Sequence, residues 1–184
     1  MRRTLTLSLT IFIALNFYCE AEIIAKNTRS INKISPRTYT VLDSMPKPTG
    51  WVNDYEKLFT PKQEVSFTTI IKNFKKQTGI EITIVTLDST YTSKEEFDEF
   101  TLQMFNTWGV GEKDKNNGIL IGISRMHRKM RIQNGYGIEK LISDAETKNI
   151  IDKYFIPGYK KGDYYKGTLS GLTNLIKLLK TKVK

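Results

Sequence analysis

The chain has 184 residues, of which 39% are hydrophobic, 26% charged and 11% aromatic, a balance that excludes a fully disordered chain, a collagen-like repeat and a polytopic membrane protein. Lys and Arg number 29 against 19 acids, and the formal charge of +10 favours anionic neighbours such as lipid headgroups, polyanions or phosphates. One Cys and one His exclude a Cys₂His₂ zinc site, an internal disulfide framework and a His-rich metal centre.

Residues 1–21 have the pattern of a cleavable signal peptide. A short basic region, Met1 to Arg3, precedes an uncharged apolar stretch that is shorter than the about 20 residues needed to span a bilayer comfortably. We therefore expect export, to a periplasm or to the medium. Lipidation at Cys19 and an uncleaved anchor are the alternatives, and Asn16-Phe17-Tyr18 fits lipidation poorly because small residues are expected there.

Residues 22–48 are predicted to be a flexible linker. They are rich in Asn, Ser, Thr, Lys and Arg, and Pro36, Pro46 and Pro48 interrupt regular structure. We place the start of the domain near Thr49 and its end near residue 181.

The first predicted helix begins at Thr60-Pro61-Lys62-Gln63, where Thr caps, Pro suits the first position and Gln completes a capping box. Gly79 is placed to end it. Residues 80–87 are short and rich in β-branched side chains, which predicts a strand. A second capping box at 93–96 predicts another helix, and its apolar face runs from Phe97 to Trp108.

A hairpin is predicted next, with strands 119–123 and 129–133 joined by Arg125–Arg128. A third capping box at 143–146 opens a helix that runs through Phe155, and Pro157-Gly158 is expected to break it. Residues 163–180 form the last predicted helix. Alternation of helices and strands, with one strand–helix–strand unit and one hairpin, predicts a small three-layer α/β sandwich with a mixed sheet.

Loop carboxylates and amides are the chemically suggestive set: Asp54, Asp114, Asn117, Glu139 and Asp144. In a parallel sheet, the loops that leave the carboxyl ends of strands collect at one edge, and oxygen ligands suit Ca²⁺ or Mg²⁺. Simpler roles are open for each residue, since Asp144 can favour the positive end of a helix and Asp114 can be a solvated loop residue.

Three further features have a structural and a functional interpretation. Gly135-Tyr136-Gly137 lacks the third glycine of a dinucleotide fingerprint, and indicates a turn with positive φ or close backbone approach. Arg131 is out of phase with its apolar neighbours, so it can pair with a carboxylate, hold an anion bidentately or lie on the surface. His127, in the hairpin turn, is expected to be exposed, and no Ser-His-Asp arrangement is visible.

Several stretches, in this order, together resemble the TPM domain family: Gly50–Asp54, Phe105–Gly111, Asn117–Ile121, Arg131–Glu139, Ser143–Ala145 and Pro157–Tyr164. The resemblance runs from about Gly50 to Leu179. It implies a Rossmann-like α/β/α sandwich with a mixed, mostly parallel sheet, outside the cytoplasm. It also implies a Ca²⁺ or Mg²⁺ site drawn from the five residues above, with Arg131 nearby. Many bacterial relatives carry a C-terminal transmembrane helix and a glycine-rich tail, so we expect a stand-alone domain here.

The resemblance and the composition lead to three functional hypotheses. The first is an exported, cation-binding TPM domain that serves as a binding or maintenance module for envelope or membrane-associated proteins. The second is a metal-dependent acid phosphatase, an activity attributed to some family members. The third is a basic module that binds anionic surfaces weakly. We expect a monomer without specific nucleic-acid binding.

Overall fold

The structure, a computed structural model, describes residues 45–183 and contains a four-stranded sheet in the order β1-β2-β3-β4. The strands are β1 (Val52–Asp54), β2 (Glu81–Thr86), β3 (Gly118–Ser124) and β4 (Lys129–Asn134). β1 and β3 run parallel to β2, and β4 runs antiparallel to β3. The mixed, mostly parallel sheet predicted from the sequence is confirmed.

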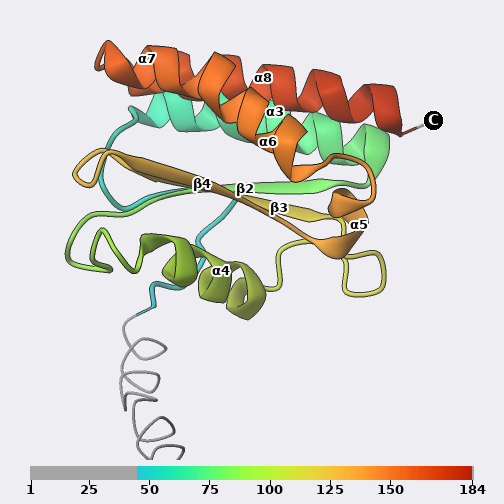
Figure 1. The fold of residues 1–184 in the computed structure, drawn as a ribbon, viewed down its shortest axis with the longest axis horizontal. Helices are drawn as coiled ribbons and strands as arrows, with labels where there is room; N and C mark the ends of the chain where they lie inside the picture. The colour runs from blue at the N-terminus through green and yellow to red at the C-terminus, as the bar shows by residue number, and fades with distance from the viewer. Residues whose placement is uncertain (1–44, 184) are drawn as a thin grey trace, which may run out of the picture. The chain divides into compact units, whose positions relative to one another are not determined.

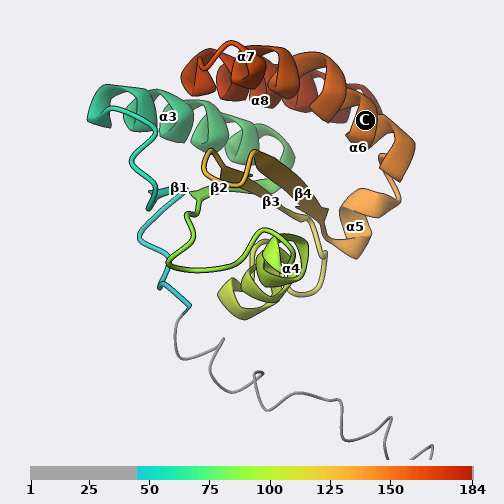
Figure 2. The ribbon, with the colours of Figure 1, turned by 60° about the vertical axis from the view of Figure 1, so that its left-hand side comes forward.

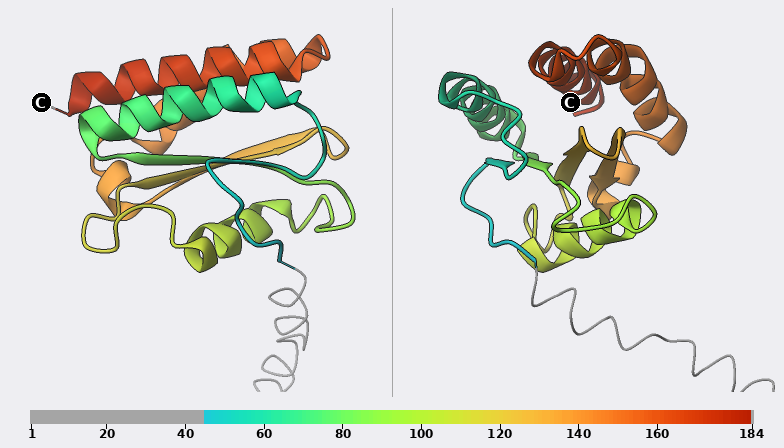
Figure 3. Two further views of the ribbon diagram at one scale, coloured as in Figure 1. Left: turned by 180° about the vertical axis from the view of Figure 1, so that it is seen from behind. Right: turned by 90° about the vertical axis from the view of Figure 1, so that its left-hand side faces the viewer.

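Helices cover both faces of this sheet. They are α3 (Pro61–Thr78), α4 (Phe97–Trp108), α5 (Tyr136–Glu139), α6 (Asp144–Ile150), the π-helix η1 (Ile151–Phe155), α7 (Ile156–Lys160) and α8 (Tyr164–Lys182). Figure 1 shows α3 and α8 with α6 and α7 on one face, and Figure 2 and the right-hand view of Figure 3 show α4 on the other. The three-layer α/β/α sandwich is therefore present.

The core follows from the strand sequences. Every residue of β3 is buried, as expected for a strand with helices on both faces. Alternate residues Ile119, Ile121 and Ile123 join the main core cluster with Phe67 and Leu172 from the helices. On the other face α4 approaches so closely that a Cβ added at Gly122 would lie 2.7 Å from the Thr101 methyl group.

Two of the three predicted capping boxes are confirmed at helix starts, those of Thr60 with Gln63 and of Ser143 with Glu146. Gly79 ends α3 in the left-handed conformation, with φ of 76°. The Ser93–Glu96 exchange also forms, with Ser93 Oγ 2.8 Å from Glu96 Oε2. It closes a turn before the helix, however, because α4 begins at Phe97.

The predicted break at Pro157-Gly158 is wrong, because the chain stays helical through Lys160. Pro157 has no N–H to donate, so its α-helical bond is absent, and the preceding turn widens into η1, where the Ile156 N–H bonds to the Ile151 carbonyl. This winding places the Phe155 ring against α8. A Cβ added at Gly171 would lie 2.1 Å from a ring carbon of Phe155.

The predicted signal peptide and most of the predicted linker lie outside the described residues. The compact unit that contains the sheet begins at Met45. The Trp108 indole N–H donates to the Pro46 carbonyl at 2.9 Å, and the Tyr55 hydroxyl donates to the Lys47 carbonyl at 2.6 Å. Within residues 45–183, no helix is both long enough and apolar enough to cross a bilayer.

The contact between Gly171 and Phe155 gives a direct stability test. Gly171→Ala gains helix propensity, but the new methyl group overlaps the Phe155 ring, so we expect a net loss of about 1–3 kcal/mol in the free energy of unfolding. Urea denaturation measures it. Thr173→Ala, at an exposed position of the same helix, should change the value by less than about 0.5 kcal/mol. Equal stability of Gly171→Ala and the parent chain would contradict this packing.

Candidate functional site

The strand register separates the residues predicted to form one metal site. Asp54 pairs with Thr86 at the carboxyl ends of β1 and β2, whereas Asn117 directly precedes Gly118, which pairs with Glu81 at the amino ends of β2 and β3. Glu139 follows β4, which runs in the opposite direction and finishes at that same amino edge. The structure therefore does not bring the five residues to one edge of the sheet.

The individual environments of these residues also differ. Asn117 is buried and structural, since its Oδ1 accepts the Glu112 N–H at 2.8 Å and its Nδ2 donates to the Gly79 carbonyl at 2.9 Å. Asp114, Glu139 and Asp144 are exposed, and Asp144 lies in the first turn of α6. Arg131 is exposed on the edge strand β4. Among the described residues no three His, Cys, Asp or Glu side chains are grouped so that they could hold a metal ion.

The Gly135-Tyr136-Gly137 motif has the structural role that its composition indicates. A Cβ at Gly137 would lie 2.2 Å from the Lys115 carbonyl oxygen, and one at Gly135 would lie 2.4 Å from the Asn116 carbonyl oxygen. The Gly137 N–H donates to the Asn116 carbonyl at 3.0 Å. Close backbone approach is thus confirmed as the reason for both glycines.

At the opposite, carboxyl edge, Asp54 organises the backbone that leads into α3. Its Oδ1 accepts the Leu58 N–H at 2.9 Å and the Thr86 hydroxyl at 2.5 Å, and its Oδ2 accepts the Phe59 N–H at 2.7 Å. The Thr86 hydroxyl oxygen in turn accepts the Glu56 N–H at 2.9 Å. The carboxylate therefore links β1, β2 and the loop between them.

Glu56 extends this network to the β3–β4 turn. Its side chain is only 5% exposed, and its two oxygens accept the N–H groups of Arg125 and Met126, each at 2.8 Å. The Arg125 Nε lies 3.9 Å from the same carboxylate. A buried carboxylate with two backbone donors fixes the position of the turn, and with it the side chains that the turn carries.

A cleft of about 810 Å³ lies beside this turn, between it and the turn that joins α7 to α8. Its lining residues are Ser124, Arg125, Met126, Arg128, Lys129, Ile156, Tyr159, Lys160, Gly162 and Tyr164. We call this space the basic cleft, because four of these side chains are cationic and none is acidic. Figure 1 and the left-hand view of Figure 3 both place the two turns at the same end of the sheet.

Two stacked tyrosines form the aromatic part of the basic cleft. The rings of Tyr159 and Tyr164 lie 4.7 Å apart at 18°, and the Tyr159 hydroxyl lies 2.9 Å from the Thr168 hydroxyl. Burial raises the pKa of Tyr159. Burial and the Glu56 charge raise the pKa of Tyr164, against the opposing effect of Arg125 and Arg128. Both phenols are therefore protonated donors at neutral pH.

The basic cleft was not predicted from the sequence. The signal was present in the run Arg125-Met126-His127-Arg128-Lys129, which places three cations in and beside a tight turn at the carboxyl end of a strand. His127 corrects a further expectation, since it is half-buried and its Nε2 lies 2.9 Å from the Thr92 carbonyl oxygen. It ties the turn to the loop before α4.

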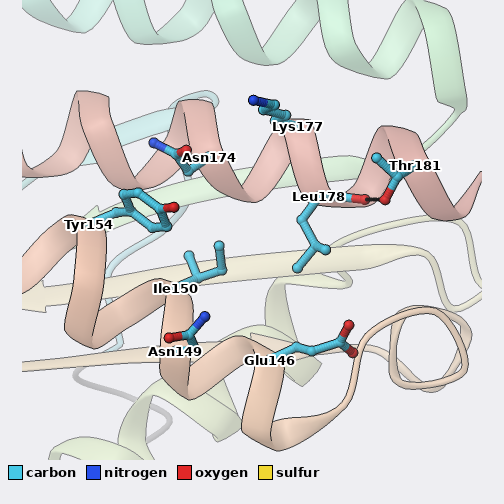
Figure 4. A pocket seen from close by; sticks show the side chains of 8 residues that line it. All are labelled: Glu146, Asn149, Ile150, Tyr154, Asn174, Lys177, Leu178 and Thr181. Carbon is cyan, nitrogen blue, oxygen red and sulfur yellow. Dashed lines mark hydrogen bonds between the residues drawn. The ribbon is translucent and has the colours of Figure 1, made fainter.

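A second hollow, of about 370 Å³, lies between α6 and α8. Figure 4 shows Asn149 and Ile150 on one side and Leu178 on the other. Glu146 and Lys177 line it with opposite charges, and Lys182 donates to Glu146 at 2.9 Å. Mixed charge and smaller volume make this groove a weaker candidate for a ligand site than the basic cleft.

Comparison with known proteins identifies the family. The sequence profile of the TPM domain matches residues 52–178, which is more than half of the chain. The chain belongs to the TPM domain family. The five stretches that carried the resemblance lie in or next to this range, and the recognition from sequence is confirmed.

Solved structures support this assignment. The N-terminal domain of a P. gingivalis protein is 28% identical, with a TM-score of 0.65 over 73% of this chain and 85% of that one. The BA42 protein of Bizionia argentinensis is 19% identical, with a TM-score of 0.61 over 70% and 86% of the two chains. The N-terminal domain of the Corynebacterium glutamicum protein cg2496 is 17% identical, with a TM-score of 0.54 over 75% and 84%. The last two show the fold alone, and no curated protein matches the chain significantly.

The anchoring role of Glu56 in this TPM domain is testable by Glu56→Gln. The amide turns one acceptor into a donor that faces a backbone N–H, so we expect the free energy of unfolding to fall by about 2 kcal/mol. Chemical denaturation measures the change. Glu95→Gln, at an exposed position before α4, is the matched control and should leave stability unchanged. A Glu56→Gln protein as stable as its parent would contradict the anchor.

The Glu146 carboxylate provides a test by pH. Hydrogen bonds from the Ser143 N–H and from Lys182 lower the pKa of Glu146 from 4.5 to about 2. Its contribution to stability is therefore fully present above pH 4.5 and is lost as the pH falls towards 2. Carboxyl ¹³C NMR should show a midpoint near 2. Lys182→Gln should raise that midpoint, whereas Lys180→Gln should not; a Glu146 midpoint at its ordinary value in the parent chain would contradict the interaction.

Proposed function

We propose that this chain is an exported TPM domain that acts as a binding module at the cell envelope, and that the basic cleft at the carboxyl edge of its sheet is the ligand site. Its ligand class is a phosphate or phosphate-like anion. The observation that carries the proposal is the composition of the cleft, in which four cationic side chains and no acidic one surround the largest of the described hollows.

The position and chemistry of the basic cleft both favour an anion. Ligands of open α/β sheets bind outside the carboxyl ends of the parallel strands, where this cleft lies. Guanidinium groups match phosphate oxygens bidentately, and the cleft contains two of them, Arg125 and Arg128. The Tyr164 hydroxyl adds a neutral donor. Arg128 has no acidic partner within 4 Å among the described residues, so its charge is available to a ligand.

Binding, rather than phosphate hydrolysis, is the function that these residues support. General acid–base catalysis needs a group that can exchange a proton near neutral pH. The side chains that line the cleft include no carboxylate and no imidazole, and the two phenols have raised pKa values. The phosphatase hypothesis rests on the family resemblance, without a catalytic arrangement in this cleft to support it.

Divalent-cation binding is a second proposal that the resemblance supports. Because Asp54 donates no free edge to the others, such a site would draw on Asp114, Glu139 and Asp144, with Asn117 already committed to backbone bonds. Ca²⁺ and Mg²⁺ both prefer such oxygen ligands. The cation proposal and the anion proposal concern opposite edges of the sheet, so one experiment separates them.

Titration of the ¹⁵N-labelled chain with inorganic phosphate at pH 7 tests the anion proposal. We expect saturable amide shifts in residues 125–129 and 162–164. Loss of one charge-assisted contact in Arg128→Gln should weaken binding about tenfold. Arg131→Gln, which removes an equal charge from an exposed strand position outside the cleft, should leave the affinity unchanged.

The same titration with CaCl₂ reads the amides around Asp114 and Glu139, which should shift if the cation proposal holds. Absence of saturable phosphate shifts in residues 125–129, or equal weakening by Arg128→Gln and Arg131→Gln, would contradict the anion proposal. Absence of calcium shifts up to millimolar metal would contradict the cation proposal.

A further inference from the structure

We propose that the β3–β4 turn docks on an anionic lipid bilayer, with Met126 inserted among the headgroups while the basic cleft receives a headgroup phosphate. This inference rests on the proposed function, because it assigns the source of the anion that the cleft binds. It adds a residue, Met126, that a soluble anion would not require.

Met126 is an exposed apolar side chain at the tip of a cationic turn. It is 58% exposed and lines the basic cleft. Arg125 and Arg128 close the turn around it, with the Arg128 N–H bonded to the Arg125 carbonyl at 3.2 Å and Arg128 at a positive φ of 52°. Because Glu56 holds the N–H of Met126 itself, the tip is fixed by a buried carboxylate.

The neighbouring α7–α8 turn extends the positive face. Lys160 lines the basic cleft, and Lys161 lines an adjoining hollow together with Arg125 and Tyr164. Neither lysine has an acidic partner within 4 Å among residues 45–183. The acid beside them, Asp163, caps α8 and pairs with Lys166 at 3.1 Å.

An apolar tip surrounded by cations fits a membrane interface better than it fits a soluble ligand. A free phosphate would use the guanidinium and ammonium groups but leave Met126 in water. At an anionic bilayer, the cations meet the negative surface while the apolar side chain enters the boundary between headgroups and acyl chains. Both properties of the turn are then used.

Three other large hydrophobic side chains in the described residues are exposed, and they provide internal comparisons: Val65, Leu102 and Tyr136. None of them lines the basic cleft. Tyr136 is 74% exposed and begins α5, which follows β4 at the opposite edge of the sheet. Its replacement is therefore a matched control for loss of one exposed hydrophobic side chain.

Vesicle binding tests the inference. The full chain is sedimented with vesicles of phosphatidylglycerol and phosphatidylcholine, and with phosphatidylcholine alone. We expect binding to the anionic vesicles only. Met126→Ser should lower the partition coefficient about tenfold, because burial of a Met side chain is lost, whereas Tyr136→Ser should leave it unchanged. All variants share residues 1–44, so any contribution of that segment cancels in the comparison.

A second readout locates the contact. In protein labelled with ¹³C at the Met methyl groups, vesicles that contain a nitroxide headgroup should broaden the Met126 signal and spare Met104, which is fully buried under α4. Equal partitioning of Met126→Ser and the parent chain, or an unbroadened Met126 signal, would overturn the membrane inference. Phosphate binding in solution without vesicle binding would overturn it too and leave the proposed function standing. Loss of both would remove both proposals.

Discussion

Two carboxylates at the carboxyl edge of the sheet set the geometry on which the rest depends. Asp54 accepts two backbone N–H groups and the Thr86 hydroxyl, and Glu56 accepts two backbone N–H groups of the β3–β4 turn. Charge-assisted bonds to the backbone are strong, and they are most valuable where water is excluded. These interactions fasten three connections, those after β1, β2 and β3, to one another.

The anchored turn then presents cations instead of acids at the edge where ligands of such sheets bind. The acidic residues that the family resemblance pointed to are divided between the two edges, while Arg125, Arg128, Lys129 and Lys160 gather around one cleft. The net positive charge of the chain is thus concentrated at a hollow next to an exposed Met side chain. A phosphate-bearing partner at the cell envelope is the proposal that uses all of these features.

Local signals in the sequence predicted most of the fold. Capping residues Thr60 and Ser143, and the β-branched run that became β2, fixed their elements because each depends on neighbours only a few residues away. β1 was not predicted, since three residues show no periodicity and its pairing with β2 is long-range. The continuation of the helix past Pro157 depends on a π turn that no local preference indicates.

The site was harder to predict because edges are a property of strand direction. The loop that holds Asp114 enters β3 and so lies at the amino edge, and Glu139 leaves an antiparallel strand that finishes there as well. The contact between the β3–β4 turn and the α7–α8 turn joins residues more than thirty positions apart. Only the tertiary structure reveals that their cations share a cleft.

Amide hydrogen exchange is the measurement that tests the carboxylate anchors most directly. In metal-free buffer, the amides of Leu58, Phe59, Arg125 and Met126 should exchange slowly, and added Ca²⁺ should leave their rates unchanged, because Asp54 and Glu56 hold them without a metal. Rapid exchange of these four amides in chelator, slowed on addition of Ca²⁺, would show that the carboxylates need an ion to organise this edge and would contradict the account.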